Sequence, residues 1–160
     1  MIDEHHTFLE RAALEVDTEF RQPIPYVLIT NSLGNVALMR RMTGQGEARL
    51  HGKFYIGAGG HVEEGHTVFY TALKEVTEEL GLPLQSLESR GVLITTGGPV
   101  EDVHLCIFYK ASTVYSQFRG TEEHLQKPEW AKPLALAERG PSMERWSQVV
   151  LRDYLNISVA

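Results

Sequence analysis

Cysteine, clustered positive charge and long apolar runs are all scarce in this sequence. Cys106 is the only cysteine among 160 residues, so the chain can form neither an intrachain disulfide nor a cysteine-rich zinc site. Because Cys106 lies in a β-prone run, we expect it to be a buried small hydrophobe rather than a nucleophile. No apolar run has the length of a membrane span, and the residues after Met1 lack the basic and then apolar layout of a signal peptide. The sequence therefore predicts a cytoplasmic protein with no membrane partner.

The net charge of the chain bears on a further class of binding partner, nucleic acids. The formal net charge is −6 and no block of lysine or arginine occurs, which argues against binding to duplex nucleic acid. An acidic protein that acts on phosphates would need a metal ion to offset the repulsion. Hydrophobic residues at 42% and charged residues at 22% are typical of a globular chain, and the length predicts one domain over residues 1–160.

Several familiar catalytic and metal motifs are absent. There is no Walker pattern and no Gly-x-Ser-x-Gly elbow. None of the seven histidines has a His-Glu-x-x-His or comparable spacing, so we expect each imidazole to be solvated or packed in the core. His61 and His66 are less certain cases, because they lie within the one stretch that carries a specific pattern.

That stretch runs from residue 59 to residue 82 and predicts a glycine turn followed by a helix. Thr67 suits the N-cap of the helix, while Gly81 and Pro83 suit its end. Apolar residues recur at helical spacing and predict one face packed on the core: Phe69, Ala72, Leu73, Val76 and Leu80.

Three carboxylates share a neighbouring arc of this helix. Glu75, Glu78 and Glu79 repel one another by about 0.2–0.5 kcal/mol per pair, and Lys74 precedes Glu78 in the weaker orientation for an ion pair. A divalent cation bound through carboxylate oxygens would relieve this repulsion. From the spacing alone, a solvated acidic helix face explains the pattern equally well.

The stretch resembles the Nudix box, which reads Gly, five residues, Glu, seven residues, Arg-Glu, an apolar residue, any residue, Glu-Glu, any residue, Gly and an apolar residue. The positions that match in register are Gly60, Glu75, Val76, Glu78, Glu79, Gly81 and Leu82. Two positions depart, because His66 replaces the first glutamate and Lys74 replaces the arginine. In the family those two side chains pair and brace the loop against the helix. Since histidine and lysine cannot form a salt bridge, we expect a weaker brace, or one replaced by packing and a histidine hydrogen bond.

The resemblance also implies the roles of individual residues. It implies that Mg²⁺ or Mn²⁺ is held by the carbonyl of Gly59 and by three glutamates that serve catalysis: Glu75, Glu78 and Glu79. Nudix enzymes frequently use a further glutamate as a base, and we place Glu122 and Glu123 ahead of Glu101 for that role.

Other residues are candidates for contacting the substrate. Arginine and lysine side chains upstream of the box could contact substrate phosphates, although each alone also fits a surface charge: Arg40, Arg41, Arg49 and Lys53. Aromatic residues could stack on a base, although aromatics in β-runs usually belong to the core: Tyr26, Phe54, Tyr55 and Trp130.

The order of the elements predicts an α/β fold. We expect a helix over about residues 3–20, a hairpin of residues 26–30 and 36–40, a strand at 53–56, strands at 90–96 and 103–110, a short strand at Trp130 and a helix over about 142–155. This order suits a sandwich with a mixed sheet and matches the Nudix α/β/α sandwich, with a core over about residues 24–155. Three roles stay open for the N-terminal helix, namely packing on the domain, covering the site or joining a homodimer contact.

Three functions follow from the resemblance. The first is a metal-dependent hydrolase that cleaves a phosphoanhydride bond in a small-molecule nucleoside diphosphate linked to another moiety. The second, motivated by His66 and Lys74, is a catalytically degenerate Nudix module that binds a nucleotide or metabolite as a sensor. The third is a prenyl diphosphate isomerase, which ranks last because its cysteine would have to be Cys106 on a strand predicted to be buried. The scaffold serves many substrates, so the leaving group is not fixed by the fold.

Overall fold

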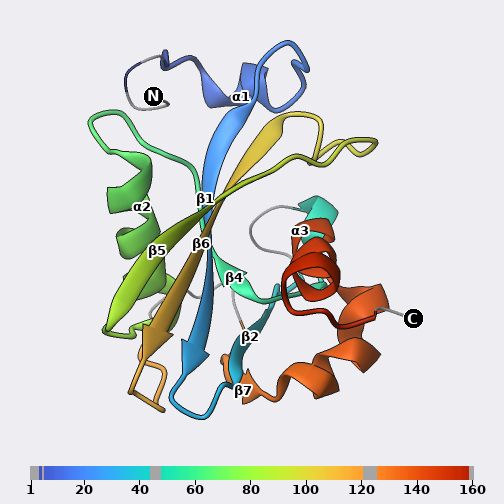
Figure 1. Cartoon of the computed structure of the whole chain (residues 1–160). Coiled ribbons are helices and arrows are strands. Elements are labelled where there is room, and N and C mark those ends of the chain that lie inside the picture. The colour runs from blue at the N-terminus through green and yellow to red at the C-terminus, as the bar shows by residue number, and fades with distance from the viewer. Residues whose placement is uncertain (1–3, 5, 44–47, 121–125, 159–160) are drawn as a thin grey trace.

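A mixed β-sheet forms the centre of the molecule (Figure 1). The computed structural model describes residues 4, 6–43, 48–120 and 126–158. The described strands are β1 (Gln22–Asn31), β2 (Val36–Arg40), β3 (Phe54–Tyr55), β4 (Gly57–Ala58), β5 (Ser86–Leu93), β6 (His104–Thr113) and β7 (Glu129–Ala131). Their order is β3-β2-β1-β6-β5, with β4 paired to β1 and β7 paired to β2. The long strands β1 and β6 run parallel and the other pairs are antiparallel, so the sheet is mixed as predicted.

Helical segments cover both faces of the sheet. On one face lies α2 (Val68–Glu75), which continues as a π-helical turn over Val76–Leu80. On the other lie a 3₁₀ segment over Pro133–Ser142 and α3 (Arg145–Val149), which continues as a π-helical turn over Val150–Tyr154.

Each face of the sheet has its own apolar core. Ala72 and Leu80 belong to one cluster, and Leu136 and Leu151 belong to the other. Because β1 is covered on both faces, its middle is a continuous buried run rather than an alternating one. The predicted α/β/α sandwich is confirmed.

The predicted hairpin and the glycine turn both form. Thr30 pairs with Val36, and Gly34 has φ of 75°, a conformation that glycine adopts without strain. The strand predicted at 53–56 forms over Phe54–Tyr55 as β3. The first two residues of the expected turn, Gly57 and Ala58, form the separate strand β4 and pair with β1. The turn that enters the box therefore begins at Gly59.

The N-terminal helix is much shorter than predicted. Regular helix forms only over α1 (Arg11–Leu14), which buries no residue, although the pattern predicted helix over about 3–20. Phe8, Leu9 and Val16 are 40%, 49% and 82% exposed. Short helices are marginal unless an apolar face packs on a partner, and here the expected face is not covered. Residues 1–3 and 5 lie outside the described part of the chain.

The apolar face of α2 also differs in part from the prediction. Ala72, Val76 and Leu80 are buried as expected, but Phe69 and Leu73 are 49% and 38% exposed. The strand expected at 90–96 begins earlier, as β5, because its pairing with β6 starts at Ser86. None of the helices built from described residues is long and apolar enough to cross a bilayer.

Candidate functional site

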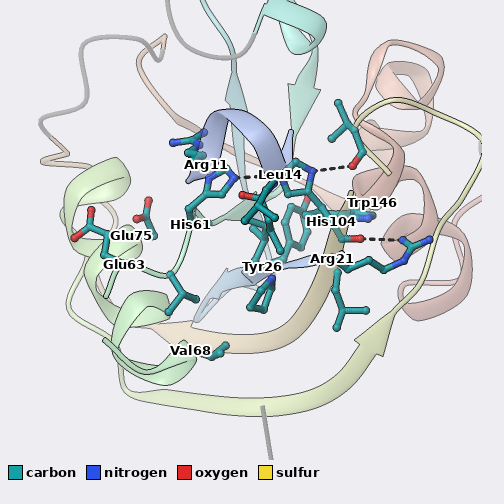
Figure 2. A pocket seen from close by; sticks show the side chains of 18 of the residues that line it. Arg11, Leu14, Arg21, Tyr26, His61, Glu63, Val68, Glu75, His104 and Trp146 are labelled. Carbon is teal, nitrogen blue, oxygen red and sulfur yellow. Dashed lines mark hydrogen bonds between the residues drawn. The ribbon is translucent and has the colours of Figure 1, made fainter. Parts of the chain in front are cut away.

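A cavity of about 1150 Å³ opens beside the box (Figure 2). Its wall is built from the N-terminal segment, the start of β1, the glycine turn, α2, the start of β6 and the start of α3. The charged and titratable residues that line it include Arg11, Arg21, Arg41, His61, Glu63, His66, Glu75, Glu79, Glu101, His104, Glu144 and Arg145. Sites that bind small molecules have a similar size, with apolar walls and a few placed polar groups.

Helix α2 carries two of the predicted carboxylates to this cavity. The backbone N–H of Tyr70 donates to Thr67 Oγ1 at 3.1 Å, so the predicted N-cap forms. At the other end Gly81 has φ of 61°, and its N–H donates to the carbonyl of Val76 at 3.1 Å, which closes the π-helical turn. Both helix ends are therefore fixed by residues of the box, and Glu75 and Glu79 lie in the cavity wall between them. Glu79 is only 4% exposed.

The glycines of the turn are required by close packing. A Cβ on Gly59 would overlap the carbonyl oxygen of Pro25, and a Cβ on Gly60 would lie 2.6 Å from the carboxylate of Glu75. Glycine at position 60 lets the backbone approach that carboxylate, and glycine at position 59 lets it pass close to Pro25. Carboxylate oxygens are donors that Mg²⁺ and Mn²⁺ prefer, so Glu75 and Glu79 in one cavity wall fit the expected ions.

Glu78 lies apart from these two carboxylates. It does not line the cavity in the part of the chain that the structure describes, and its side chain is 39% exposed. Its Oε2 lies 3.2 Å from Nζ of Lys74, which also lies 3.8 Å from Oε1 of Glu75. The repulsion expected among the three carboxylates is thus partly compensated by Lys74, despite the weaker orientation of the pair. These contacts raise the pKa of Lys74, even though burial would lower it.

Glu63 contributes to the contact between the loop and helix α2. This is the contact that we expected to be weak, because His66 and Lys74 replace the usual pair. Lys74 Nζ lies 3.5 Å from Glu63 Oε1, and His66 Nδ1 lies 3.6 Å from Glu63 Oε2. Glu63 is itself in the loop, three residues before His66, and its side chain is 61% exposed. An acid and a base therefore still connect loop and helix, through a different acidic residue.

A buried ion pair also lies in the cavity wall. Arg41 Nε donates to Glu144 Oε1 at 3.0 Å, and the guanidinium stacks 4.5 Å from the centre of the Tyr55 ring. Burial would lower the pKa of Arg41, but the charge of Glu144 outweighs it, so the pKa is raised and the guanidinium stays charged. Burial raises the pKa of Glu144 against the opposing effect of Arg41.

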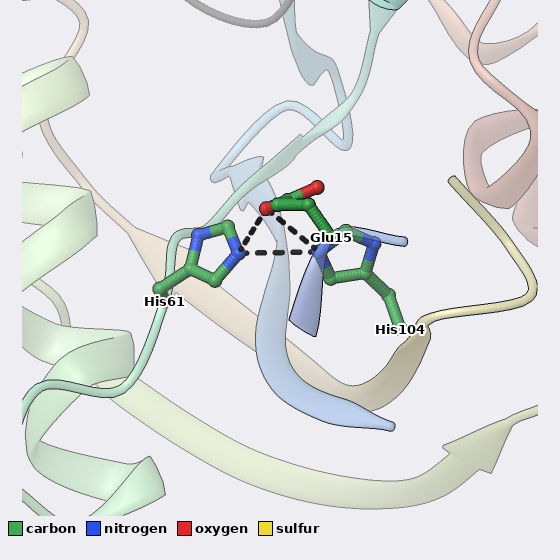
Figure 3. Close-up of side chains that lie close together, drawn as sticks. All are labelled: Glu15, His61 and His104. Atoms are coloured by element: carbon green, nitrogen blue, oxygen red, sulfur yellow. Dashed lines mark hydrogen bonds and ion pairs between the residues drawn. The ribbon is translucent and has the colours of Figure 1, made fainter. Parts of the chain in front are cut away.

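A second group of polar side chains, Glu15 with the cavity residues His61 and His104, meets beside the glycine turn (Figure 3). His61 Nε2 lies 3.1 Å from His104 Nε2 and 3.4 Å from Glu15 Oε1, and His104 Nε2 lies 3.8 Å from the same oxygen. Burial, together with nearby Arg11 and His104, lowers the pKa of His61 to about 4. Burial would raise the pKa of Glu15, but the hydrogen bond from Arg49 and the two histidines lower it overall. Near neutral pH the group therefore has a neutral His61 and an ionised Glu15.

The remaining predicted site residues are placed as follows. Arg41 lines the cavity, whereas Arg49 binds the carbonyl of Pro99 at 2.7 Å and Glu15 Oε2 at 2.5 Å. Lys53 is absent from the described cavity wall. Glu122 and Glu123 lie outside the described residues, and Glu101, the lower-ranked loop glutamate, lines the cavity.

The aromatic candidates are mostly structural. Tyr55 is fully buried, and the hydroxyl of Tyr26, which is 3% exposed, lies 2.6 Å from Ser147 Oγ. Phe54 lies beneath the guanidinium of Arg40, and Trp130 donates its ring N–H to the carbonyl of Ser116. Of these four only Tyr26 lines the cavity among the described residues.

Sequence reasoning missed several residues of the cavity. His104 and Trp146 come from distant parts of the chain and have no motif spacing that connects them. The same holds for Glu15, which lies against His61 and His104. Phe8 and Phe20 were assigned to a helix that does not extend to them, but they line the cavity while staying 40% and 43% exposed. Only His61 carried a signal, because it follows Gly60 of the box.

Comparison with known proteins agrees with this architecture. A family model described as the NUDIX domain matches residues 20–153. Protein YmaB of Bacillus subtilis (strain 168) is 41% identical over 97 residues, which are 59% of this chain and 47% of YmaB. The match therefore spans less than half of the length of that curated relative.

Solved structures share the fold over most of the chain. Tm1382, assigned as a Nudix hydrolase, superposes with a TM-score of 0.78 and 29% identity, covering 97% of this chain and 81% of its own. A NUDIX hydrolase from Nitrosomonas europaea has a TM-score of 0.68 and 16% identity, covering 85% of this chain and 89% of its own. A MutT protein from Methanosarcina mazei Go1 has a TM-score of 0.63 and 18% identity, covering 86% and 94%. At such low identity the last two show a shared fold and no more.

Proposed function

The chain belongs to the NUDIX family and is a Nudix-type hydrolase, and we propose that it cleaves a phosphoanhydride bond in a nucleoside diphosphate linked to another moiety. We propose Mg²⁺ or Mn²⁺ as its cofactor. The observation that carries the proposal is the pair of carboxylates, Glu75 and Glu79, in one cavity wall beside Gly60. A bound divalent cation neutralises phosphate oxygens and orients an attacking water.

The residues of the site have distinct proposed roles, as metal ligands and as a general base. Glu75, Glu79 and the carbonyl of Gly59 would hold the ion. We also propose Glu78 as a ligand, because it occupies a ligand position of the Nudix box. In the structure its side chain pairs with Lys74. A loop glutamate accepts the proton of the attacking water on a carboxylate oxygen, with Glu122 or Glu123 as first choice and Glu101 as the alternative that lines the cavity.

The cavity also supports a nucleoside as part of the substrate. Phe8, Phe20 and Trp146 offer aromatic surface in its wall, and aromatic faces stack on bases of any sequence. Arg41 supplies a charged guanidinium in the cavity wall, where it would attract the diphosphate. Arg49 and Lys53 stay predictions as phosphate contacts, and Arg49 would have to exchange its contact with Glu15 to serve.

A second candidate function is a sensor that binds the same ligand without turnover. It is favoured by one observation, namely that the contact between loop and helix relies on Glu63, which is 61% exposed. Exposed ion pairs contribute little to stability. Glu63 therefore holds the loop on the helix less firmly than the glutamate–arginine pair of the family would.

Isomerisation of a prenyl diphosphate gains no support. Cys106 is fully buried in the core on the α3 side of the sheet, and burial raises the pKa of its thiol. It is absent from the described wall of the cavity.

The test is a substrate panel with the full chain. Phosphate and nucleotide release is followed from nucleotide sugars, dinucleoside polyphosphates, nucleoside triphosphates and prenyl diphosphates, with Mg²⁺, with Mn²⁺ and with chelator. We expect metal-dependent turnover of the nucleoside diphosphate derivatives. If calorimetry shows tight nucleotide binding but no member of the panel is hydrolysed with either metal, the sensor replaces the hydrolase. Turnover that persists in chelator would contradict the metal assignment.

A further inference from the structure

Two histidines of the cavity wall and a neighbouring glutamate form a set of nitrogen and oxygen donors outside the signature positions of the Nudix box. Glu15 follows the last residue of α1, His61 follows the glycine turn, and His104 begins β6. Their donor atoms lie within 4.8 Å of one another. We propose that these three residues form a second metal site, separate from the carboxylates of α2, that binds Zn²⁺ or a similar nitrogen-preferring dication.

The distances between the donor atoms suit tetrahedral zinc. Zinc binds imidazole nitrogen and carboxylate oxygen at about 2.0–2.2 Å, so two ligands of a tetrahedron lie about 3.3–3.6 Å apart. The three separations found here are 3.1, 3.4 and 3.8 Å. Movements of a few tenths of an ångström would therefore complete three corners of the site, and the cavity leaves the fourth corner for water.

The tautomer of His104 is already the one that a metal needs. Its Nδ1 lies 2.7 Å from the carbonyl oxygen of Val100, which can only accept, so Nδ1 carries the proton and Nε2 presents a lone pair. Histidines that bind metals commonly donate their other N–H to a carbonyl in this way. The amide of Gln22, 3.5 Å from the same Nε2, is a weaker competitor for that lone pair.

The short contact between the two imidazoles follows from the same tautomer. With no metal bound, a proton on His61 Nε2 has two acceptors, Nε2 of His104 at 3.1 Å and Oε1 of Glu15 at 3.4 Å. A metal ion between the two nitrogens would take the place of that proton, and His61 would then carry its own proton on Nδ1.

Glu15 is oriented for the same site by its second oxygen. Oε2 accepts from Arg49 at 2.5 Å, which leaves Oε1 directed at the two imidazoles. Arg11 Nε lies 3.4 Å from Oε1 and competes for it, but Arg11 is largely exposed and can swing into solvent. A hydrogen-bonded carboxylate is typical of the outer contacts that fix metal ligands.

The donor chemistry separates this site from the box. Two imidazoles and one carboxylate favour zinc and related transition metals, whereas Glu75 and Glu79 offer only oxygen, which suits Mg²⁺ or Mn²⁺. Figure 2 shows His61 between Glu75 on the α2 side and His104 on the β6 side. Because Glu15 belongs to the N-terminal segment, a metal here would fasten that segment across the cavity and hold the glycine turn beside it.

The test measures metal binding and requires no substrate. The full chain is stripped of metal, excess Mg²⁺ is added to occupy the oxygen site, and Zn²⁺ is titrated by calorimetry against the wild type, Glu15→Gln, His61→Ala and Glu79→Gln. Glu10→Gln is the matched control, because it removes an exposed carboxylate from the same segment. Circular dichroism confirms that each variant is folded.

We expect the wild type, Glu10→Gln and Glu79→Gln to bind one equivalent of Zn²⁺ equally well. Loss of an outer contact already costs about 10–100-fold in affinity, so loss of the ligand His61 should cost at least about 100-fold, and Glu15→Gln at least about tenfold. Co²⁺ should give the strong visible absorption of tetrahedral coordination in the wild type and lose it in His61→Ala.

Two outcomes of the titration would overturn the proposal. One is Zn²⁺ affinity in His61→Ala and Glu15→Gln equal to that of the wild type. The other is Zn²⁺ binding that disappears in Glu79→Gln alone, which would assign the ion to the box. Histidine ¹⁵N spectra give an independent measurement, because Nε2 of both His61 and His104 should shift together on addition of Zn²⁺, and unchanged resonances would also refute the site.

Discussion

Replacing Arg41 with methionine should destabilise the protein strongly, because it leaves the carboxylate of Glu144 buried without its partner. The two side chains are 16% and 9% exposed and their atoms meet at 3.0 Å. Removing one member of a buried pair costs about 3–5 kcal/mol. For a chain of this size that corresponds to a fall in Tm of roughly 6–20 °C. Methionine keeps part of the packing on the Tyr55 ring, so most of the loss is electrostatic.

The loss of folding stability in Arg41→Met should also depend on pH and should be larger at higher pH. Burial raises the pKa of Glu144, and Arg41 opposes that effect in the wild type. Without Arg41 the folded-state pKa lies further above the unfolded value of about 4.3. Below that value both states are protonated and the penalty vanishes; as pH rises, the unfolded state releases a proton that the folded state retains, so the deficit grows. Arg41→Met should therefore lose more stability relative to wild type at pH 8 than at pH 5.

Thermal and urea unfolding at these two pH values measure the effect. Arg41→Met/Glu144→Gln should recover much of the lost stability, because no buried charge is left unpaired. Arg90→Gln, which breaks an exposed pair with Glu88, is the control and should leave Tm unchanged. A fall in Tm for Arg41→Met that is no larger than that of the control, or that is equal at both pH values, would refute this reasoning.

Three further changes test other parts of the structure. Gly60→Ala should lower metal-dependent turnover sharply while the fold persists, because its Cβ would lie 2.6 Å from the Glu75 carboxylate; unchanged kinetics would argue against close packing there. Glu63→Gln should change the free energy of unfolding by less than about 1 kcal/mol but raise the Mg²⁺ concentration needed for half-maximal rate, and an unaltered metal dependence would remove Glu63 from the loop–helix contact. Leu80→Ala should cost about 2–5 kcal/mol in urea unfolding, since Leu80 is fully buried; a loss below 1 kcal/mol would show that the core collapses around the gap.

The local signals of the sequence predicted much of the fold. Thr67 and Gly81 set the ends of α2 as expected, because capping depends on hydrogen bonds within a few residues. The N-terminal helix was predicted too long, because helical spacing of Phe8, Leu9 and Val16 shows that a face could pack but not that a partner covers it.

The site was predictable only where a motif spans it. The spacing of Glu75 and Glu79 is local to one helix, so the box located both of them. Whether Glu78 faces the cavity or Lys74 depends on side-chain placement around a π-helical turn, which a helical wheel of 3.6 residues per turn does not describe. Glu15 and His104 meet His61 only because β1 and β6 pair and α1 lies over their ends, which is tertiary information.

The central claim is that Glu79 is a metal-binding carboxylate of a hydrolase rather than a structural residue. The most direct measurement is the initial rate on the best nucleoside diphosphate derivative as a function of Mg²⁺ and Mn²⁺ concentration, for the wild type, Glu79→Gln and the exposed control Glu88→Gln. The account predicts that Glu79→Gln loses several orders of magnitude in rate at saturating metal while its Tm changes little, and that Glu88→Gln behaves as the wild type. A Glu79→Gln enzyme that keeps its rate and its metal dependence would contradict the account.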